Sequence, residues 1–140
     1  MELDLFLKMP RRCKMIPKFR AWDKTSKEMY DVEAINFNRG KFESIGYGVT
    51  SLRSADKVEL MQSTGLKDKN GKEIFEKDIL DYNGRKVIVK WHGSYASFIY
   101  EFVDELENRV TEWQPLYLSY YHFEIIGNIY ENPELLEVTE

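Results

Sequence analysis

Residues 78–102 read DILDYNGRKVIVKWHGSYASFIYEF, and the pattern of this stretch decides the fold. Apolar and polar side chains alternate along 85–91, which indicates a β-strand with two differently lined faces. Asn83 and Gly84 precede that strand, and both tolerate the positive φ angles of a two-residue hairpin turn. One face of this strand would hold Val87, Val89 and Trp91, and a third strand would turn inward Ala96, Phe98, Tyr100 and Phe102. Three strands joined by tight turns within about 25 residues predict a strongly bent meander, because closing such a sheet removes its open edges.

The N-terminal half carries weaker patterns. Residues 16–22 alternate apolar and basic side chains, and turn-forming residues separate them from a second short run at 29–32, which predicts a hairpin. Residues 38–56 hold several glycines and serines without clear periodicity, so we expect a loop with short strand segments there. Residues 58–62 predict one more strand, which would end in a turn at 64–65.

The C-terminal part mixes helical and strand signals. Residues 104–114 are polar with apolar residues at near-helical spacing, and Pro115 would end any helix there. We expect a last strand at 122–130, with Gly127 as a bulge or a point of close approach. Residues 132–134, Asn-Pro-Glu, have the N-cap, first-turn proline and acidic first turn of a short helix.

These patterns together predict an α+β fold that is mainly β. Residues 15–63 would form a small N-terminal β-hairpin subdomain. Residues 64–140 would form an SH3-like barrel subdomain that ends in the short C-terminal helix. Residues 1–14 would precede both as an N-terminal extension.

Composition excludes several classes of protein. The chain has 140 residues, 43% hydrophobic and 31% charged, as expected of a globular protein that folds without disulfides or metals. Its longest stretch without a formal charge, 113–123, is far below the roughly 18 apolar residues of a membrane span. Cys13 is the single cysteine, which excludes an internal disulfide framework. No signal peptide is evident, so we expect a cytoplasmic protein with no membrane contact.

The net charge of −4 hides an uneven distribution. Residues 1–20 carry a net +4, whereas residues 101–140 carry ten acids and one base. Overall acidity argues against a general nucleic-acid binder, but a basic region could still reach nucleic acid. The residues that this alternative would use are Lys18, Arg20, Lys86 and Lys90.

No catalytic or metal motif stands out, so we expect a protein without catalytic residues, metal or cofactor. Asp78 and Asp81 lie three residues apart, and a strand would point them to opposite faces. His92 and His122 have no ligand-type spacing, and no phosphate-binding glycine loop occurs. The acidic group formed by Glu73, Glu76 and Asp78 is interpreted as a solvated hairpin.

Aromatic residues are the stronger functional signal. The chain has 20 of them, 14% of its length, which is more than a small barrel core readily hides. Tyrosine and tryptophan combine a large apolar body with a polar tip, which suits interfaces and ligand grooves. The candidate contact residues are Trp113, Tyr117, Tyr120 and Tyr121. They could fill the seam between the two subdomains, form a protein-protein surface, most simply between copies of this chain, or stack on nucleic-acid bases.

Three tracts resemble one known family. They are IPKFRAWD at 16–23, LMQSTGLKDKNGKEIFEKDI at 60–79 and IIGNIYENPELL at 125–136, in that order along the chain. Together they resemble the YopX family of phage and prophage proteins from Gram-positive bacteria. One departure is Lys77, which stands where the family usually has a glycine. The family also tends to begin near Met15, so residues 1–14 would be either a true N-terminal extension or upstream sequence read from an earlier start codon.

The resemblance implies a fold and a setting rather than an activity. It implies a two-part structure with an SH3-like barrel in the C-terminal part. It also implies a phage or prophage accessory protein of unknown biochemical function in the cytoplasm of a bacterial host. We therefore expect a non-enzymatic module that binds a phage or host protein or a second copy of itself, with nucleic-acid binding in phage replication or regulation as the alternative.

Overall fold

The computed structural model describes residues 16–48, 51–105 and 113–137, so residues 1–14 and Cys13 lie outside the described part. Within these ranges the chain forms twelve strands and five short 3₁₀ segments, with no α-helix. The strands are β1 (Phe19–Asp23), β2 (Glu28–Asp31), β3 (Ala34–Asn38), β4 (Lys41–Tyr47), β5 (Ser51–Ser54), β6 (Val58–Lys67), β7 (Glu73–Phe75), β8 (Asp78–Tyr82), β9 (Arg85–His92), β10 (Ser97–Phe102), β11 (Trp113–Pro115) and β12 (Glu124–Asn128). The 3₁₀ segments are η2 (Ala55–Lys57), η3 (Val103–Glu105), η4 (Leu116–Leu118), η5 (Tyr120–His122) and η6 (Pro133–Leu136). The prediction that the fold is mainly β is confirmed, and its helical part is limited to 3₁₀ segments in the described residues. None of the described helical segments is long and apolar enough to cross a membrane.

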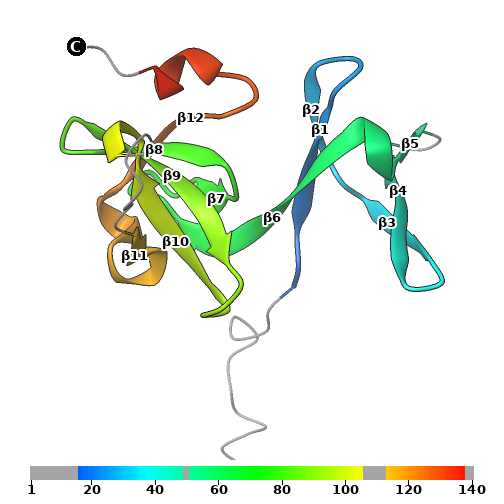
Figure 1. Ribbon diagram of the computed structural model, residues 1–140, viewed down its shortest axis with the longest axis horizontal. Coiled ribbons are helices and arrows are strands. Elements are labelled where there is room, and N and C mark those ends of the chain that lie inside the picture. Colours follow the sequence, from blue (N-terminus) through cyan, green and yellow to red (C-terminus); the bar gives the residue numbers. More distant parts are fainter. Residues whose placement is uncertain (1–15, 49–50, 106–112, 138–140) are drawn as a thin grey trace, which may run out of the picture.

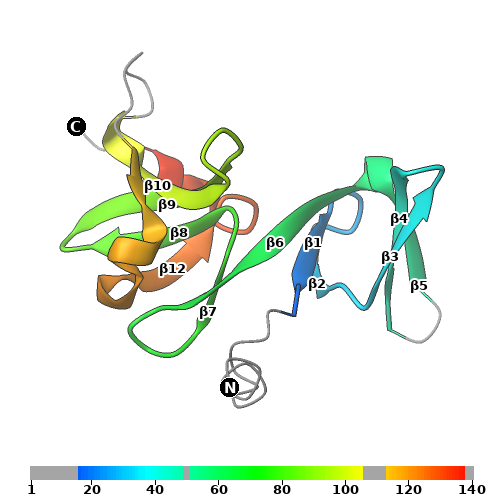
Figure 2. The same ribbon diagram turned by 90° about the horizontal axis from the view of Figure 1, so that it is seen from below.

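Strand β6 connects the two ends of the molecule (Figures 1 and 2). It belongs to the four-stranded sheet β2-β1-β6-β7, in which the predicted hairpin of β1 and β2 is confirmed. Its first part pairs with β1 and its second part with β7. The predicted turn at 64–65 is wrong, because Gly65 (φ +77°) takes up a local irregularity inside a continuous strand. The predicted subdomain boundary after residue 63 falls within this strand.

The segment expected as a loop with short strand segments, 38–56, belongs mainly to a three-stranded sheet of β3, β4 and β5. Polar side chains take part in its pairing, since Asn36 Nδ2 donates to Ser44 Oγ at 3.0 Å across β3 and β4. This explains why the strands lack an apolar alternation. The buried cluster beneath this sheet is small: Ala21, Ile45 and Val58.

Strands β8 to β12 form a five-stranded antiparallel sheet, β11-β10-β9-β8-β12, which curls into a half-barrel (Figure 1). The predicted meander is confirmed, and Asn83 and Gly84 have φ angles of 49° and 88° at its first turn. The alternation along β9 is also confirmed, because Val87 and Val89 pack in the larger core while Ile88 packs on the other face. That larger core holds Ile74, Leu80, Val87, Val89, Tyr100, Leu116 and Phe123.

Two expectations for the C-terminal part need correction. Trp113 and Gln114 lie in strand β11, paired with β10, and not in a helix. The C-terminal helix is a single 3₁₀ segment, because Asn132 turns its side chain back to accept from the Asn128 N–H (3.2 Å) instead of capping. Gly127 is confirmed as a bulge and a close approach, since a Cβ there would collide with the Asn132 side chain.

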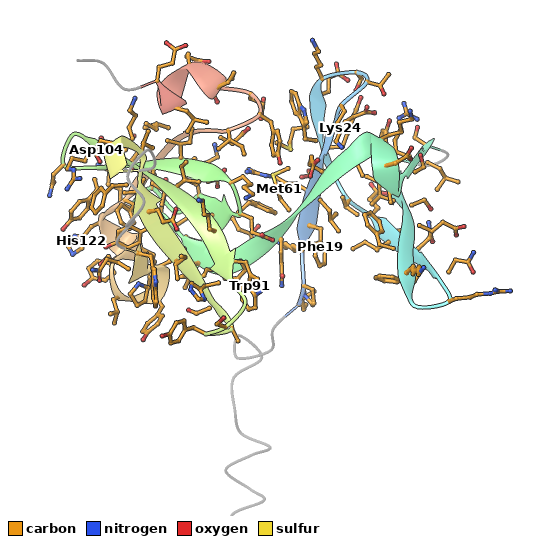
Figure 3. The ribbon with its side chains drawn as sticks, viewed as in Figure 1. Phe19, Lys24, Met61, Trp91, Asp104 and His122 are labelled. Atoms are coloured by element: carbon orange, nitrogen blue, oxygen red, sulfur yellow. The ribbon has the colours of Figure 1, made fainter. Side chains whose placement is uncertain are left out.

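A buried ion pair joins the β1–β2 hairpin to the half-barrel. Arg20 of β1 donates to Asp78 of β8 at 2.7 Å, and its guanidinium also reaches the Glu76 carbonyl at 3.2 Å. Figure 3 shows Met61 in the same seam, where it is 1% exposed. Trp22 stacks on Tyr130 with ring centroids 5.8 Å apart. These contacts fix how the two parts of the chain meet.

Candidate functional site

An aromatic pocket of about 320 Å³ opens between β6, the β9–β10 hairpin and η4. Its walls are Trp91 from the end of β9, Phe98 opposite it on β10, and Tyr117 from η4. The Trp91 and Phe98 rings meet edge to face with centroids 5.0 Å apart. Trp91 is 49% exposed and Tyr117 is 58% exposed. Two large aromatic rings therefore stand in solvent at one opening, a feature typical of binding surfaces.

The side of the pocket formed by β6 is held in place by local hydrogen bonds. Thr64 Oγ1 donates to the Ile74 carbonyl at 2.7 Å and accepts from the Leu66 N–H at 3.1 Å, which fixes the irregular stretch of β6. Gln62 donates its backbone N–H to Glu76 at 2.8 Å, while its side-chain amide has no hydrogen-bond partner among the described residues. The Gln62 amide is thus an open donor and acceptor beside apolar walls.

The lining is chemically neutral, since Ala96 and Ser97 complete the pocket and no lining residue is charged. Ligand pockets commonly span about 300–1,000 Å³, so this one is at the small end. A neutral aromatic wall of this size suits one or two uncharged side chains better than a charged cofactor. We therefore take this pocket as the candidate functional site.

The four aromatic residues predicted for contact do not form one cluster. Tyr117 lines the pocket, whereas Trp113 of β11 contacts His92 at the end of β9 (centroids 4.9 Å apart). Tyr120 packs partly buried against the larger core and meets the exposed Tyr121 edge to face. Tyr117 and Tyr121 are each more than half exposed, so these two do not fill the seam between the two parts.

The cations named for nucleic-acid contact are mostly paired with carboxylates. Lys18 lies 3.6 Å from Glu73, and Lys90 lies 2.7 Å from Glu101. Arg20 is committed to the buried ion pair described above. Lys86 alone makes no ion pair with the described residues. A phosphate would have to displace a carboxylate at three of the four positions.

The acidic group at Glu73, Glu76 and Asp78 is not the solvated hairpin that we expected. Asp78 is 1% exposed and accepts from Arg20 and, at 2.8 Å, from the Phe75 N–H. Burial raises the pKa of Asp78 above its ordinary value, although Arg20 and the Phe75 N–H oppose that shift. Glu73 accepts from Ser63 Oγ at 2.8 Å. These carboxylates therefore serve the junction between strands.

No metal-binding arrangement is found in the part of the chain that the structure describes. Within it, no three side chains of the types His, Cys, Asp and Glu are grouped closely enough to hold an ion. His92 lies among the rings of Tyr95 and Trp113, and His122 lies against Tyr121, so each histidine has aromatic neighbours. Figure 3 shows His122 at the outer side of the half-barrel, whereas Trp91 lies at its lower end.

Sequence reasoning missed Trp91 as a contact residue. Its place in the alternation of β9 predicted an inward side chain, but β9 runs past the end of the core and leaves this ring half exposed. The turn residues directly after it, His92-Gly93-Ser94, are the signal that could have marked the end of the covered strand. Gln62 and Leu66 gave no signal, because their role depends on the irregular stretch of β6.

One family model and one solved structure are similar to nearly the whole chain. Residues 18–137 match the family described as YopX protein. The crystal structure of protein EF1440 from Enterococcus faecalis is similar, with 34% sequence identity and a TM-score of 0.64, and the match covers 89% of this chain and all of that one. No curated protein matches the chain.

Proposed function

The chain belongs to the YopX family, and on that premise we propose that it is a phage or prophage accessory protein that binds other proteins and has no enzymatic activity. We place its action in the cytoplasm of the bacterial host. The curled five-stranded sheet is, in this proposal, an SH3-like barrel that presents the binding surface. The strongly bent β8-β9-β10 meander, with β12 on the far side of β8, supports that assignment.

The observation that carries the proposal is the neutral aromatic pocket. Trp91 and Tyr117 leave about half of their surface in water beside the Gln62 amide, which has no hydrogen-bond partner within the described ranges. Interfaces are enriched in tyrosine and tryptophan and depleted of charge at their centres. A small uncharged pocket with exposed rings at its opening therefore fits a peptide segment with an apolar or aromatic side chain.

The nucleic-acid alternative has less support. Binding to phosphates requires cations that are free to replace counterions. Of the four cations that this alternative names, only Lys86 has no carboxylate partner among the described residues. Bases would also have to stack at a pocket with no basic residue in its lining.

A peptide-library selection against the immobilised full chain tests the proposal. The selected peptides are then titrated by calorimetry into the wild type, into Ala96→Arg and into Lys86→Ala. Ala96 lines the pocket and is exposed. Its φ of 48° already accommodates a side chain, so an arginine adds bulk there without changing the backbone conformation. We expect peptides with an aromatic residue that bind the wild type and Lys86→Ala equally and bind Ala96→Arg at least about tenfold more weakly.

Two results would overturn the proposal. One is a selection that yields only peptides with equal affinity for all three proteins, which would separate binding from the pocket. The other is retention of DNA or RNA on filters at low salt that Lys86→Ala abolishes, which would favour the nucleic-acid alternative.

A further inference from the structure

The end of the molecule opposite the half-barrel carries an exposed aromatic residue. Phe37 lies on β3 beside the β3–β4 turn and is 65% exposed. Among the described residues, its one ring contact is with Phe42 across the hairpin, with centroids 6.5 Å apart. Arg39 (φ 52°) and Gly40 (φ 79°) make the tight turn that holds this ring at the tip. The hairpin tip, residues 37–42, is thus a small apolar projection.

The same tip is basic. Arg39 and Lys41 are exposed and make no ion pair with the described residues. Glu43, the nearest acid along β4, accepts a hydrogen bond from Asn38 at 3.4 Å. The tip therefore carries two uncompensated positive charges next to its aromatic ring.

The two parts of the described chain carry net charges of opposite sign, and the part that includes the basic tip is the positive one. Described residues up to 57 include eight basic and six acidic side chains, a net of +2. Described residues from 58 onward include seven basic and thirteen acidic side chains, a net of −6. Opposite net charges attract the small-sheet end of one molecule to the half-barrel end of another, and this attraction orients their encounter.

We propose that the hairpin tip of one copy docks in the aromatic pocket of a second copy, with the Phe37 ring against Trp91, Phe98 and Tyr117. Figures 1 and 2 place the β3–β4 hairpin and the half-barrel in separate parts of an elongated molecule, with β6 between them. The contact therefore joins two chains. It rests on the proposed function and adds the identity of the partner and the two surfaces that meet.

The fit is argued from size, chemistry and exposure. The pocket has room for one or two side chains, and its neutral aromatic walls match a phenylalanine ring. The flexible ammonium of Lys41 and the guanidinium of Arg39 would stay at the rim, in water. Both surfaces lose exposed aromatic area in the contact, which is the driving force for association.

The test uses three variants of the full chain and their molar masses by size-exclusion chromatography with light scattering. Phe37→Ser removes the aromatic ring from the hairpin tip. Ala96→Arg fills the pocket with a bulky side chain whose positive charge repels the basic tip. Leu52→Ser is the matched control for the tip, because Leu52 is 62% exposed in the same sheet but lies on β5, opposite Gly46 of β4 and outside the hairpin tip. Ser94→Arg is the control for the pocket, since it adds the same side chain to the same turn outside the lining.

We expect the wild type and both controls to associate with rising concentration. Phe37→Ser and Ala96→Arg should each associate about 30-fold more weakly, the loss typical of a central aromatic contact. An equimolar mixture of these two variants should recover a one-to-one pair, because one supplies an intact pocket and the other an intact tip. Circular dichroism of each variant checks that it is folded.

A wild type that stays monomeric, or a mixture in which the two variants fail to pair, would overturn the inference. Either result leaves the proposed function standing if the selected peptides still bind the wild type and lose affinity for Ala96→Arg. If those peptides fail while the mixture pairs, the pocket serves only a second copy of the chain.

Discussion

The half-barrel and the three-stranded sheet of β3–β5 are both antiparallel, yet they differ in how much core supports them. The half-barrel encloses a cluster of seven buried residues, in which Leu80 and Phe123 are fully buried. The small sheet lies over a cluster of three buried residues, of which only Ile45 comes from the sheet itself. The small sheet therefore depends on the β1–β2 hairpin and on β6 for its stability.

That difference also separates two kinds of surface. A small core leaves apolar side chains outside, and Phe37 and Leu52 are each more than 60% exposed on the small sheet. The half-barrel buries Tyr100 and Phe123 and exposes rings such as Trp91 where a strand outruns the core. One end thus presents a projection and the other a pocket.

Core truncation should produce the largest difference between the two parts. Phe123→Ala should lower the free energy of unfolding by about 4 kcal/mol, because it opens a cavity in the larger core. Ile45→Ala should cost about 3 kcal/mol and act first on the small sheet. Urea denaturation measures the free energy of unfolding of each variant, and hydrogen exchange shows which part of the chain loses protection. Equal loss of protection in the half-barrel for both variants would mean that the two parts unfold as one unit.

The buried Arg20–Asp78 pair tests the junction between the parts. Asp78→Ala should cost about 3 kcal/mol, because it leaves a buried guanidinium without its partner. Asp81→Ala, on the same strand but only half-buried, is the control and should change stability by no more than about 0.5 kcal/mol. Urea denaturation at pH 7 measures the loss in free energy of unfolding for both variants. A loss below about 1 kcal/mol for Asp78→Ala would contradict a structural role for the pair.

Two buried carboxylates, Asp68 and Asp23, each hold a turn. Asp68 accepts from the N–H groups of Asn70, Lys72 and Ile125 at 2.9–3.0 Å, and Asp23 accepts from Thr25, Ser26 and Arg53 at 2.8–3.1 Å. Burial would raise the pKa of each, but these donors outweigh burial and hold both pKa values below their ordinary value.

These carboxylates make a prediction about pH. A depressed pKa stabilises the fold above the ordinary value of about 3.9, and that stability is lost as the pH falls through the lower, folded value. Asp68→Asn should therefore cost about 2 kcal/mol at pH 7 and less at each lower pH below about 4. Thermal unfolding across this pH range measures the gap between variant and wild type. A gap that does not narrow toward acid would show that the charge of Asp68 is unimportant.

The smallest effect is expected at Lys77. Its φ of 69° is a left-handed conformation that costs a side-chain-bearing residue about 1 kcal/mol. The residue is held there because its N–H donates to Val89 and its carbonyl accepts from Ile129. Lys77→Gly should stabilise the chain by up to about 1 kcal/mol, whereas Lys72→Gly in the preceding turn should not. Thermal melts compare the two, and a destabilised Lys77→Gly would refute the strain argument.

The same contrast explains what could be predicted from sequence. Clear signals in the half-barrel were confirmed: the alternation along β9, the Asn83-Gly84 turn and the bulge at Gly127. These are local features whose physics is visible in neighbouring residues. In the small sheet, pairing by polar side chains such as Asn36 and Ser44 leaves no alternation, so the sequence of 38–56 indicates only short strand segments within a loop.

Long-range contacts account for the other failures. The run through Thr64 and Gly65 was expected to turn, but pairing with β7 carries the strand onward. Of the candidate contact residues, Tyr117 lies at the pocket. The pocket itself forms only because β6 and η4 lie around Trp91 in the folded chain. Such a meeting depends on the whole fold, and no local pattern encodes it.

Hydrogen exchange of the full chain at low and high protein concentration tests the central claim most directly. The account predicts that raising the concentration protects two separate regions together, the hairpin tip at 37–42 and the pocket segment at 91–98. In Phe37→Ser neither region should gain protection. Protection of only one region, or of neither while the molar mass rises, would contradict the docking of tip into pocket.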